Sequence, residues 1–333
     1  SRRCLTRCPG PPHRQTSVVA RVPLSVNRMT SELSRFLGCL LGLAVGDAVG
    51  ATVEFKKRGD FFPISDMVGG GPYKLKPGQW TDDTSMALCL ATSLVEREGF
   101  DGIDQMKRYC QWRGEGYLSS TGECFDIGHT TNYALDCYQT TGEALAGPTD
   151  PDSAGNGSIM RLAPVPMFFY PEQDLVEEFS AKSSRTTHGA AACVDACRLL
   201  GVMTLRALSG APKNKVLSAG INLHFETGEI AAIATEAYRT KCEADIRGSG
   251  YVVESLETAL WCFVATESFE AAILKAANLG DDADTTAAVC GQVAGAYYGE
   301  SGIPQRWREQ VAMRENIRDL AKRLHAAQLT ASP

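Results

Sequence analysis

The sequence predicts an all-α protein, a compact, single-domain, orthogonal bundle of many helices. Apolar residues recur three and four positions apart in one segment after another, which is the spacing of a buried helix face. No stretch shows the sustained alternation of a strand. Hydrophobic residues make up 44% of the 333 positions and charged residues 22%, and the mean hydropathy is -0.14. This is an ordinary globular composition with enough apolar side chains for a large core.

Residues 1–28 differ from the rest in charge, because they contain six arginines and no acidic residue. The remainder has 27 basic against 39 acidic residues, a balance unfavourable for nucleic acid, and no nucleic-acid partner is expected. The leader has the composition of a mitochondrial transit peptide, but its four prolines would break a helix there. We expect a disordered or non-native Arg-rich leader, and place the all-α domain at residues 29–333.

Cysteine usage and hydropathy bear on the compartment. The twelve cysteines are dispersed and form no Cys-x-x-Cys pair, so no disulfide scaffold is expected. No run of eighteen apolar residues is present, so no membrane span is expected. We therefore expect a reduced, cytoplasmic protein, or a mitochondrial one if the leader is a genuine transit peptide.

The first helix is predicted to start at Ser31, where apolar residues from Leu33 to Ala44 form one stripe. Glycines at positions 38, 42 and 46 flatten another face, so that a neighbouring helix can approach closely. Glu54 follows the helix in an apolar setting. It is either an exposed loop acid or a carboxylate held against a site.

Residues 56–79 are rich in glycine and proline and predict an irregular connection. Thr81-Asp82-Asp83-Thr84 then opens a helix that continues to Val95. Threonine and aspartate are preferred at helix N-termini, so capping alone explains one or two of these residues. It does not require all four.

Two polar loops follow a helix at residues 103–112. The first contains Asp126 and leads to a helix that Thr130 or Thr131 caps and that ends near Tyr138. The second ends in a glycine-rich turn at residues 155–158, whose N–H groups could face a phosphate or sugar at a helix start near Ile159. Further helical segments are expected at 172–183, 188–209, 214–222, 229–241, 252–266, 269–278, 284–298 and 312–328.

A second acidic cluster, residues 280–286, lies between two of these helices and carries three carboxylates and two threonine hydroxyls. If the fold brings it to residues 81–84, five carboxylates share a small volume, which requires bound cations to offset their repulsion. Oxygen ligands without His or Cys favour Mg²⁺ or Mn²⁺ over zinc or copper. Two clusters suggest two ions and a hydrolytic site, and hydrolysis of a phosphate ester or of a glycosidic bond are equally open.

Seven ordered motifs between about residues 31 and 300 resemble the ADP-ribosylglycohydrolase family, in particular its branch of dinitrogenase reductase-activating glycohydrolases and ADP-ribosylarginine hydrolases. They are GLAVGDAVGATVEF at 42–55, WTDDT at 80–84, FDIG at 125–128, GNGSIMRLAP at 155–164, TH at 187–188, GSGYVV at 248–253 and GDDADT at 280–285. The resemblance implies an all-α fold with a binuclear Mg²⁺ or Mn²⁺ site in a cleft formed by loops.

The resemblance also implies roles for individual residues. The metal ligands would be Thr81, Asp82, Asp83, Asp282, Asp284 and Thr285. Asp281 falls outside the motif. The catalytic carboxylates would be Glu54 and Asp126, and which of them is the general base stays open. The substrate-binding residues would be Gly128, His129, Asn156, Gly157, Ser158, His188, Ser249, Gly250 and Tyr251. His129 stands where the family branch has asparagine, and His188 could instead be a satisfied histidine at a helix start.

The activity implied is metal-dependent hydrolysis of the N-glycosidic bond between ADP-ribose and a protein side chain, with arginine the first expectation. The partners would be an ADP-ribosylated protein as substrate and ADP-ribose as product, and the enzyme is expected to be a monomer. Alternatives are hydrolysis of another adduct, serine-linked or O-acetyl-ADP-ribose, and a non-catalytic ADP-ribose binder.

Overall fold

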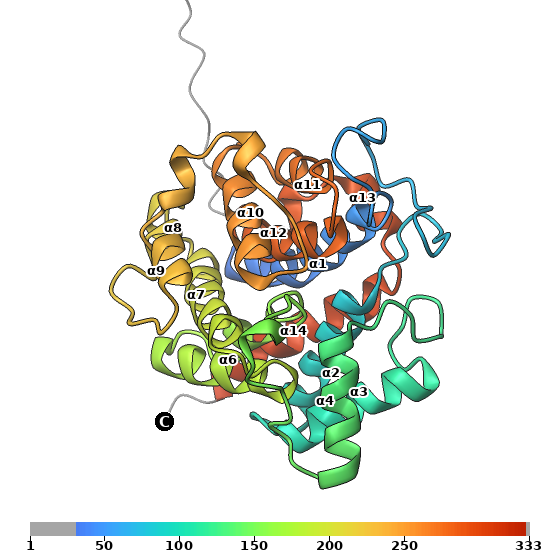
Figure 1. Cartoon of the computed structure of the whole chain (residues 1–333), viewed down its shortest axis with the longest axis vertical. Coiled ribbons are helices and arrows are strands. Elements are labelled where there is room, and N and C mark those ends of the chain that lie inside the picture. The colour runs from blue at the N-terminus through green and yellow to red at the C-terminus, as the bar shows by residue number, and fades with distance from the viewer. Residues whose placement is uncertain (1–30, 331–333) are drawn as a thin grey trace, which may run out of the picture.

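The computed structural model describes residues 31–330, and this part of the chain is helical throughout, with no strand (Figure 1). Two isolated bridges, Gly70 to Leu75 and Gly155 to Tyr251, are its only extended pairings. The predicted all-α class is confirmed. The expectation about residues 1–28 lies outside the described residues.

The α-helices are α1 (Glu32–Gly50), α2 (Asp82–Glu96), α3 (Gly102–Glu115), α4 (His129–Thr141), α5 (Pro164–Phe168), α6 (Gln173–Thr187), α7 (Ala191–Leu208), α8 (Lys213–Leu217), α9 (Gly228–Ala234), α10 (Val252–Val264), α11 (Phe269–Ala277), α12 (Ala283–Tyr298), α13 (Gln305–Gln310) and α14 (Arg314–Thr330). Four short 3₁₀ turns complete the order, η1 (Pro151–Ser153), η2 (Ala237–Thr240), η3 (Glu243–Asp245) and η4 (Glu300–Gly302).

The centre of the bundle is α1, which is buried continuously from Phe36 to Gly50. Its N-terminus is capped by Ser31, whose side chain accepts a hydrogen bond from the Ser34 N–H. With a mean hydropathy of 1.4, α1 has the length and composition of a membrane-spanning helix, but 83% of that stretch is buried inside the protein. Within the described residues it is the core helix around which α7, α11, α12 and α14 pack.

Four glycines of α1, one per turn, bring its backbone against α12. A Cβ atom at position 38, 42, 46 or 50 would lie 2.2 to 2.3 Å from a carbonyl oxygen of α12. These carbonyls belong to Gly295, Gly291, Ala287 and Ala283, so the two helices run antiparallel. The C-terminus of α1 therefore meets the N-terminus of α12, and the expected close approach at the glycine face is confirmed.

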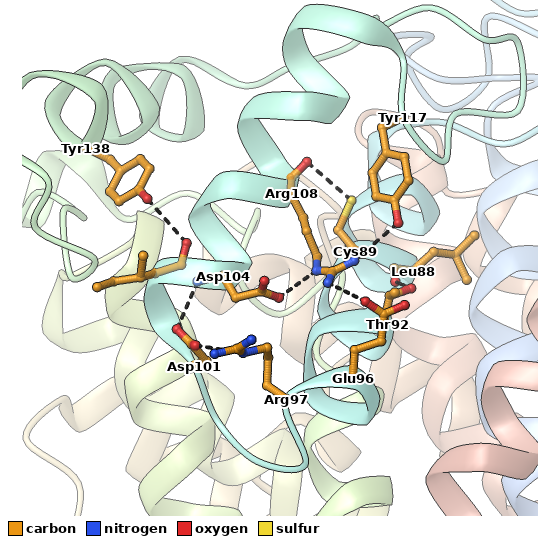
Figure 2. Close-up of polar contacts among 11 residues, drawn as sticks. Leu88, Cys89, Thr92, Glu96, Arg97, Asp101, Asp104, Arg108, Tyr117 and Tyr138 are labelled. Carbon is orange, nitrogen blue, oxygen red and sulfur yellow. Dashed lines mark hydrogen bonds and ion pairs between the residues drawn. The ribbon is translucent and has the colours of Figure 1, made fainter.

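A second, smaller apolar cluster joins α2, α3 and α4. Beside it, Arg108 of α3 donates to Asp104 (2.6 Å) and to Glu96 of α2 (2.7 Å) (Figure 2). Asp101 caps α3 by accepting from the Asp104 N–H at 2.9 Å. Because Glu96 is half exposed, this network contributes orientation more than stability.

Several helix boundaries differ from the prediction. The segment expected at 229–241 ends as α9 at Ala234, because Glu236 takes a left-handed conformation (φ 62°). The segment at 214–222 shortens to α8, and α5 and α13 were not predicted. The cap of α4 is Gly128 instead of Thr130 or Thr131. No α-helix starts at Ile159, where the chain makes successive turns instead.

Substituting Gly46 with alanine tests the contact between α1 and α12. Alanine normally favours a helix over glycine, but here its Cβ would lie 2.2 Å from the Ala287 carbonyl oxygen. We expect a loss of about 3 kcal/mol in the free energy of unfolding, measured by urea denaturation. The control is Gly114→Ala in α3, where nothing lies within 4 Å of the new methyl group, and a gain of about 0.5 kcal/mol is expected. Equal gains from both changes would contradict the packing.

Candidate metal centre and ligand cleft

Asp47, at the C-terminal end of α1, holds the start of α2. Its Oδ1 accepts from the N–H and hydroxyl of Thr81 at 2.8 and 2.9 Å, and its Oδ2 from the N–H and hydroxyl of Thr84 at 3.0 and 2.6 Å. Burial raises the pKa of Asp47 to about 6, while the bonds from Thr84 and Thr81 act in the opposite direction. Asp47, a residue of α1, therefore accepts the hydrogen bonds at the start of α2 that the side chain of the N-cap residue would usually accept.

Thr81 occupies the N-cap position of α2 but makes no capping bond with its side chain. Its hydroxyl oxygen lies 2.9 Å from Asp47, 3.1 Å from Asp284 and 3.4 Å from Asp83, in each case from a carboxylate oxygen. A hydroxyl has one proton and can donate to one of the three. The structure thus brings the two acidic clusters together, as expected. The Thr81 hydroxyl has one proton for the three carboxylates that face it, so two of them receive none from it.

The carboxylates in this cluster are buried and incompletely paired. Asp83 accepts from the Thr285 hydroxyl at 3.2 Å, but its Oδ1, Asp284 Oδ1 and Glu54 Oε2 have no hydrogen-bond partner in the described part of the chain. Burial and then neighbouring carboxylates raise the pKa of Asp83 and Asp284 well above the usual range. Unpaired buried carboxylate oxygens are costly, and bound divalent cations would satisfy them.

One oxygen each from Glu54, Asp126 and Asp284 lies within 4.8 Å of the others, a spacing that a cation could bridge. Glu54 is 3% exposed. Burial, followed by the charges of Asp126 and Asp282, raises its pKa to about 10. Burial raises the pKa of Asp126 to about 6. Of these two carboxyls, Glu54 has the pKa that is raised further, so without a cation it holds a proton more readily than Asp126.

Asp126 is positioned by the irregular connection that precedes α2. It has a left-handed backbone (φ 63°), and its Oδ1 accepts from the Tyr73 hydroxyl at 2.6 Å. The ring of Tyr73 packs against that of Phe125, with ring centres 5.0 Å apart. Tyr73 belongs to residues 56–79, which are confirmed as irregular structure, and no pattern in that segment pointed to it.

Backbone and amide bonds join the loops around the cluster. The Asn156 side chain donates to Asp282 Oδ2 at 2.7 Å, and the Asn156 N–H donates to the Gly250 carbonyl at 3.0 Å. The Asp281 carbonyl accepts from the Phe55 N–H, and the Asp281 N–H donates to the Lys56 carbonyl, both at 2.8 Å. Asp281 thus fixes the segment that carries Glu54, while its side chain does not line the cleft.

A cleft of about 520 Å³ opens above the carboxylates. Twelve predicted site residues line it, namely Glu54, Asp82, Asp126, Gly128, His129, Asn156, Gly157, His188, Gly250, Asp282, Asp284 and Thr285. Thr81 and Asp83 are fully buried and do not line it. A cavity of similar volume, about 540 Å³, lies between α6 and α7. Its Arg198 is already paired with Glu177 and Asp195, so the carboxylate cleft is the better candidate.

Three predicted substrate-binding residues do not line the cleft. Ser158 is buried and accepts a hydrogen bond from the Ser184 hydroxyl at 3.1 Å. Ser249 donates to Glu254, and Tyr251 is the exposed N-cap residue of α10. The assigned roles of all the site residues remain predictions.

Asp47 is the main residue that the sequence interpretation missed. The available signal was a charged side chain at the end of an apolar helix, inside the Gly-Asp-Ala-Val-Gly stretch at 46–50. A carboxylate there must be paired or exposed, and it is fully buried. Its partners lie some thirty-five positions later, which no local pattern indicates.

Comparisons with known proteins identify the family and support the fold. The ADP-ribosylglycohydrolase family pattern matches residues 28–333. ADP-ribosylarginine hydrolase Tri1 of Pseudomonas putida is 45% identical over 88% of this chain and 78% of its own. ADP-ribosyl-[dinitrogen reductase] glycohydrolase of Rhodospirillum rubrum is 33% identical over 84% and 91%. A solved structure described as an ADP-ribosylglycohydrolase-related protein complex has a TM-score of 0.80, at 41% identity, covering 89% of this chain and 98% of that one.

The fold and the site define a helical hydrolase with a carboxylate-lined cleft. The chain belongs to the ADP-ribosylglycohydrolase family, whose members hydrolyse the glycosidic bonds of ADP-ribose. The predicted family is confirmed, and its acidic cluster is one that can bind metal.

Asp47→Asn tests the link between α1 and α2. The new amide can no longer accept at both side-chain atoms, so the N–H and hydroxyl of Thr81 or of Thr84 lose their acceptor. We expect the free energy of unfolding to fall by about 3 kcal/mol. Asp281→Asn is the matched control, with the same loss of charge and a left-handed backbone that asparagine tolerates. Equal stability of the two variants would show that the Asp47 bonds add nothing.

Asp284→Asn and Asp82→Asn test the metal site. We expect Mg²⁺ or Mn²⁺ to raise the melting temperature of the unmodified protein, since the ions bind the folded state only. Both variants should lose this rise, and Asp281→Asn should keep it. Differential scanning fluorimetry against metal concentration gives the comparison. A loss in Asp281→Asn as large as that in Asp284→Asn would place the ligands one position away.

Proposed function

We propose that this chain hydrolyses the N-glycosidic bond between ADP-ribose and an arginine side chain of a modified protein, and so reverses mono-ADP-ribosylation. The observation that carries the proposal is the cleft in which the two acidic clusters meet the loops at 126–131 and 155–157. Support for arginine comes from relatives named ADP-ribosylarginine hydrolase at 45% and 41% identity, each across nearly nine tenths of this chain.

We propose two Mg²⁺ or Mn²⁺ ions as cofactors, held by Thr81, Asp82, Asp83, Asp282, Asp284 and Thr285. The unpartnered oxygens of Asp83 and Asp284, and the single Thr81 proton facing three carboxylates, fit cation binding. When bound, the ions would supply positive charge that orients the ribose hydroxyls and polarises a water. Asp47 is bonded at both oxygens by Thr81 and Thr84, so it positions this set without belonging to it.

The chain's own groups supply the remaining chemistry. As the C–N bond breaks, positive charge develops on the ribose ring, a water adds to the anomeric carbon and loses a proton, and the departing guanidino nitrogen gains one. Glu54 and Asp126 line the cleft outside the proposed ligand set and can move protons to and from bound groups. The Tyr73 hydroxyl holds Asp126 in place, and the bond from Asn156 to Asp282 holds the glycine-rich turn beside the acidic cluster. These contacts would hold the carboxylates in a fixed position relative to the bond that is cleaved in a bound substrate.

The decisive assay offers one preparation three substrates: an arginine-linked ADP-ribosylated protein, a serine-linked one, and O-acetyl-ADP-ribose. We expect metal-dependent release of ADP-ribose, identified by mass, with the arginine linkage cleaved fastest. Glu54→Gln and Asp126→Asn should each lower the rate by about 100-fold or more, because each removes a proton-transfer group.

Asp281→Asn should retain full activity and serves as the control. Faster cleavage of the serine or acetyl adduct would replace arginine as the substrate. Binding of ADP-ribose without turnover of any substrate would identify a non-catalytic binder.

A further inference from the structure

Arg161 is a fully buried cation beneath the cleft. Its guanidinium donates to the Gly157 carbonyl at 2.6 Å and to the hydroxyls of Thr187 and Thr186 at 2.7 and 3.2 Å, and it lies over the Tyr109 ring. Among the described residues it has no carboxylate partner. A buried cation without a counter-ion is costly, and the bonds that hold it here all lead to the loop and helix end that border the cleft.

Thr187 links this cation to His188. Its hydroxyl oxygen is 2.7 Å from Arg161 Nη2 and 2.8 Å from His188 Nδ1. A guanidinium can only donate, so the Thr187 oxygen accepts from Arg161. The Thr187 proton has no other acceptor in the described part of the chain, so it goes to Nδ1. A ring that accepts at Nδ1 carries its proton at Nε2, and burial, followed by the Arg161 charge, lowers the pKa of His188 to about 3 and keeps the ring neutral.

The protonated edge of His188 faces the glycine-rich turn. A Cβ atom would lie 3.4 Å from Nε2 if built at Gly155 and 3.1 Å if built at Gly157, so the absence of side chains leaves this nitrogen accessible. Both glycines and His188 line the cleft. The ring is 2% exposed, and within residues 31–330 its Nε2 has no hydrogen-bond partner. A nearly buried N–H donor thus points toward whatever fills the cleft.

We propose that Arg161 and Thr187 are positioning residues that fix His188 as the Nε2–H tautomer, so that it donates to a phosphate or ribose oxygen of ADP-ribose. This inference rests on the proposed function, because the ligand comes from it. The uncompensated Arg161 charge directly beneath the turn favours an anionic oxygen of the diphosphate. His188 is then a ligand-binding residue, and its place at the C-cap of α6 together with its unpartnered Nε2 favours this role over that of a satisfied helix-start histidine.

The tautomer is tested on the ligand-free protein by ¹⁵N NMR of labelled histidine, with the His188 signals assigned by their loss in His188→Gln. We expect protonated Nε2 and unprotonated Nδ1. Thr187→Val should allow the proton to move between the two nitrogens, and Thr187→Ser should restore the single tautomer. The control is Thr186→Val, which removes the neighbouring buried hydroxyl that also binds Arg161 but does not touch His188. Protonated Nδ1 in the unmodified protein would overturn the proposal, even if Thr187→Val does not fold.

Binding is measured by calorimetry with ADP-ribose and, separately, with ADP. Thr187→Val should bind ADP-ribose about 10-fold more weakly, the effect of one lost hydrogen bond, while Thr187→Ser and Thr186→Val bind normally. A loss seen with both ligands places the acceptor in their shared ADP part, where the Arg161 charge favours the diphosphate, and a loss confined to ADP-ribose places it on the terminal ribose. Unchanged affinity in Thr187→Val would overturn the positioning role of Thr187. If the unmodified protein shows the Nε2–H tautomer but binds no ADP-ribose, the proposed function fails, while the effect of Arg161 and Thr187 on the His188 tautomer stands.

Discussion

The antiparallel contact between α1 and α12 is the constraint on which the site depends. Glycines on both helices allow their backbones to touch, and this places the C-terminus of α1 beside the N-terminus of α12. Asp47 lies at the first end and Asp284 at the second, and Thr81 contacts both. Because α2 and α12 both begin here, the positive ends of two helix dipoles face the carboxylates. Backbone packing therefore determines where the charge gathers.

The helix dipoles do not neutralise the cluster. Several carboxylate oxygens are removed from water without a donor, and burial and the neighbouring carboxylates raise the pKa of Asp83 and Asp284, which favours their protonated forms when no cation is bound. Divalent ions would compete with protons for these oxygens and would offset the repulsion among the carboxylates. An arrangement that is costly when empty and stable when filled is typical of a preformed metal site.

The sequence predicted the parts whose signal is local. Helical periodicity predicted the all-α fold, the glycine spacing in α1 predicted a close neighbour, and the two acidic clusters predicted a shared site. It did not show that Asp47 caps α2 across the bundle, nor that Tyr73 in an irregular loop holds Asp126. Such bonds join positions far apart in the chain, and nothing in the local pattern distinguishes these residues from solvated ones. The left-handed Glu236 that ends α9 was missed because a helix-favouring residue occupies that turn.

The cleft is lined by carboxylates and its proposed ligand is an anion, so the two would repel each other unless positive charge offsets the repulsion. Beyond residue 28 the chain has 27 basic and 39 acidic residues, yet the ligand proposed for it is an anion. The carboxylates of the cleft would repel such a ligand unless cations covered them. Behind the glycine-rich turn, the buried Arg161 carries a positive charge that no described carboxylate cancels, and it donates to the Gly157 carbonyl and the Thr187 hydroxyl. In the proposed complex the ribose would lie against the carboxylates and their cations, and the diphosphate against the turn that Arg161 supports, so these two charges together would determine the direction of the ligand.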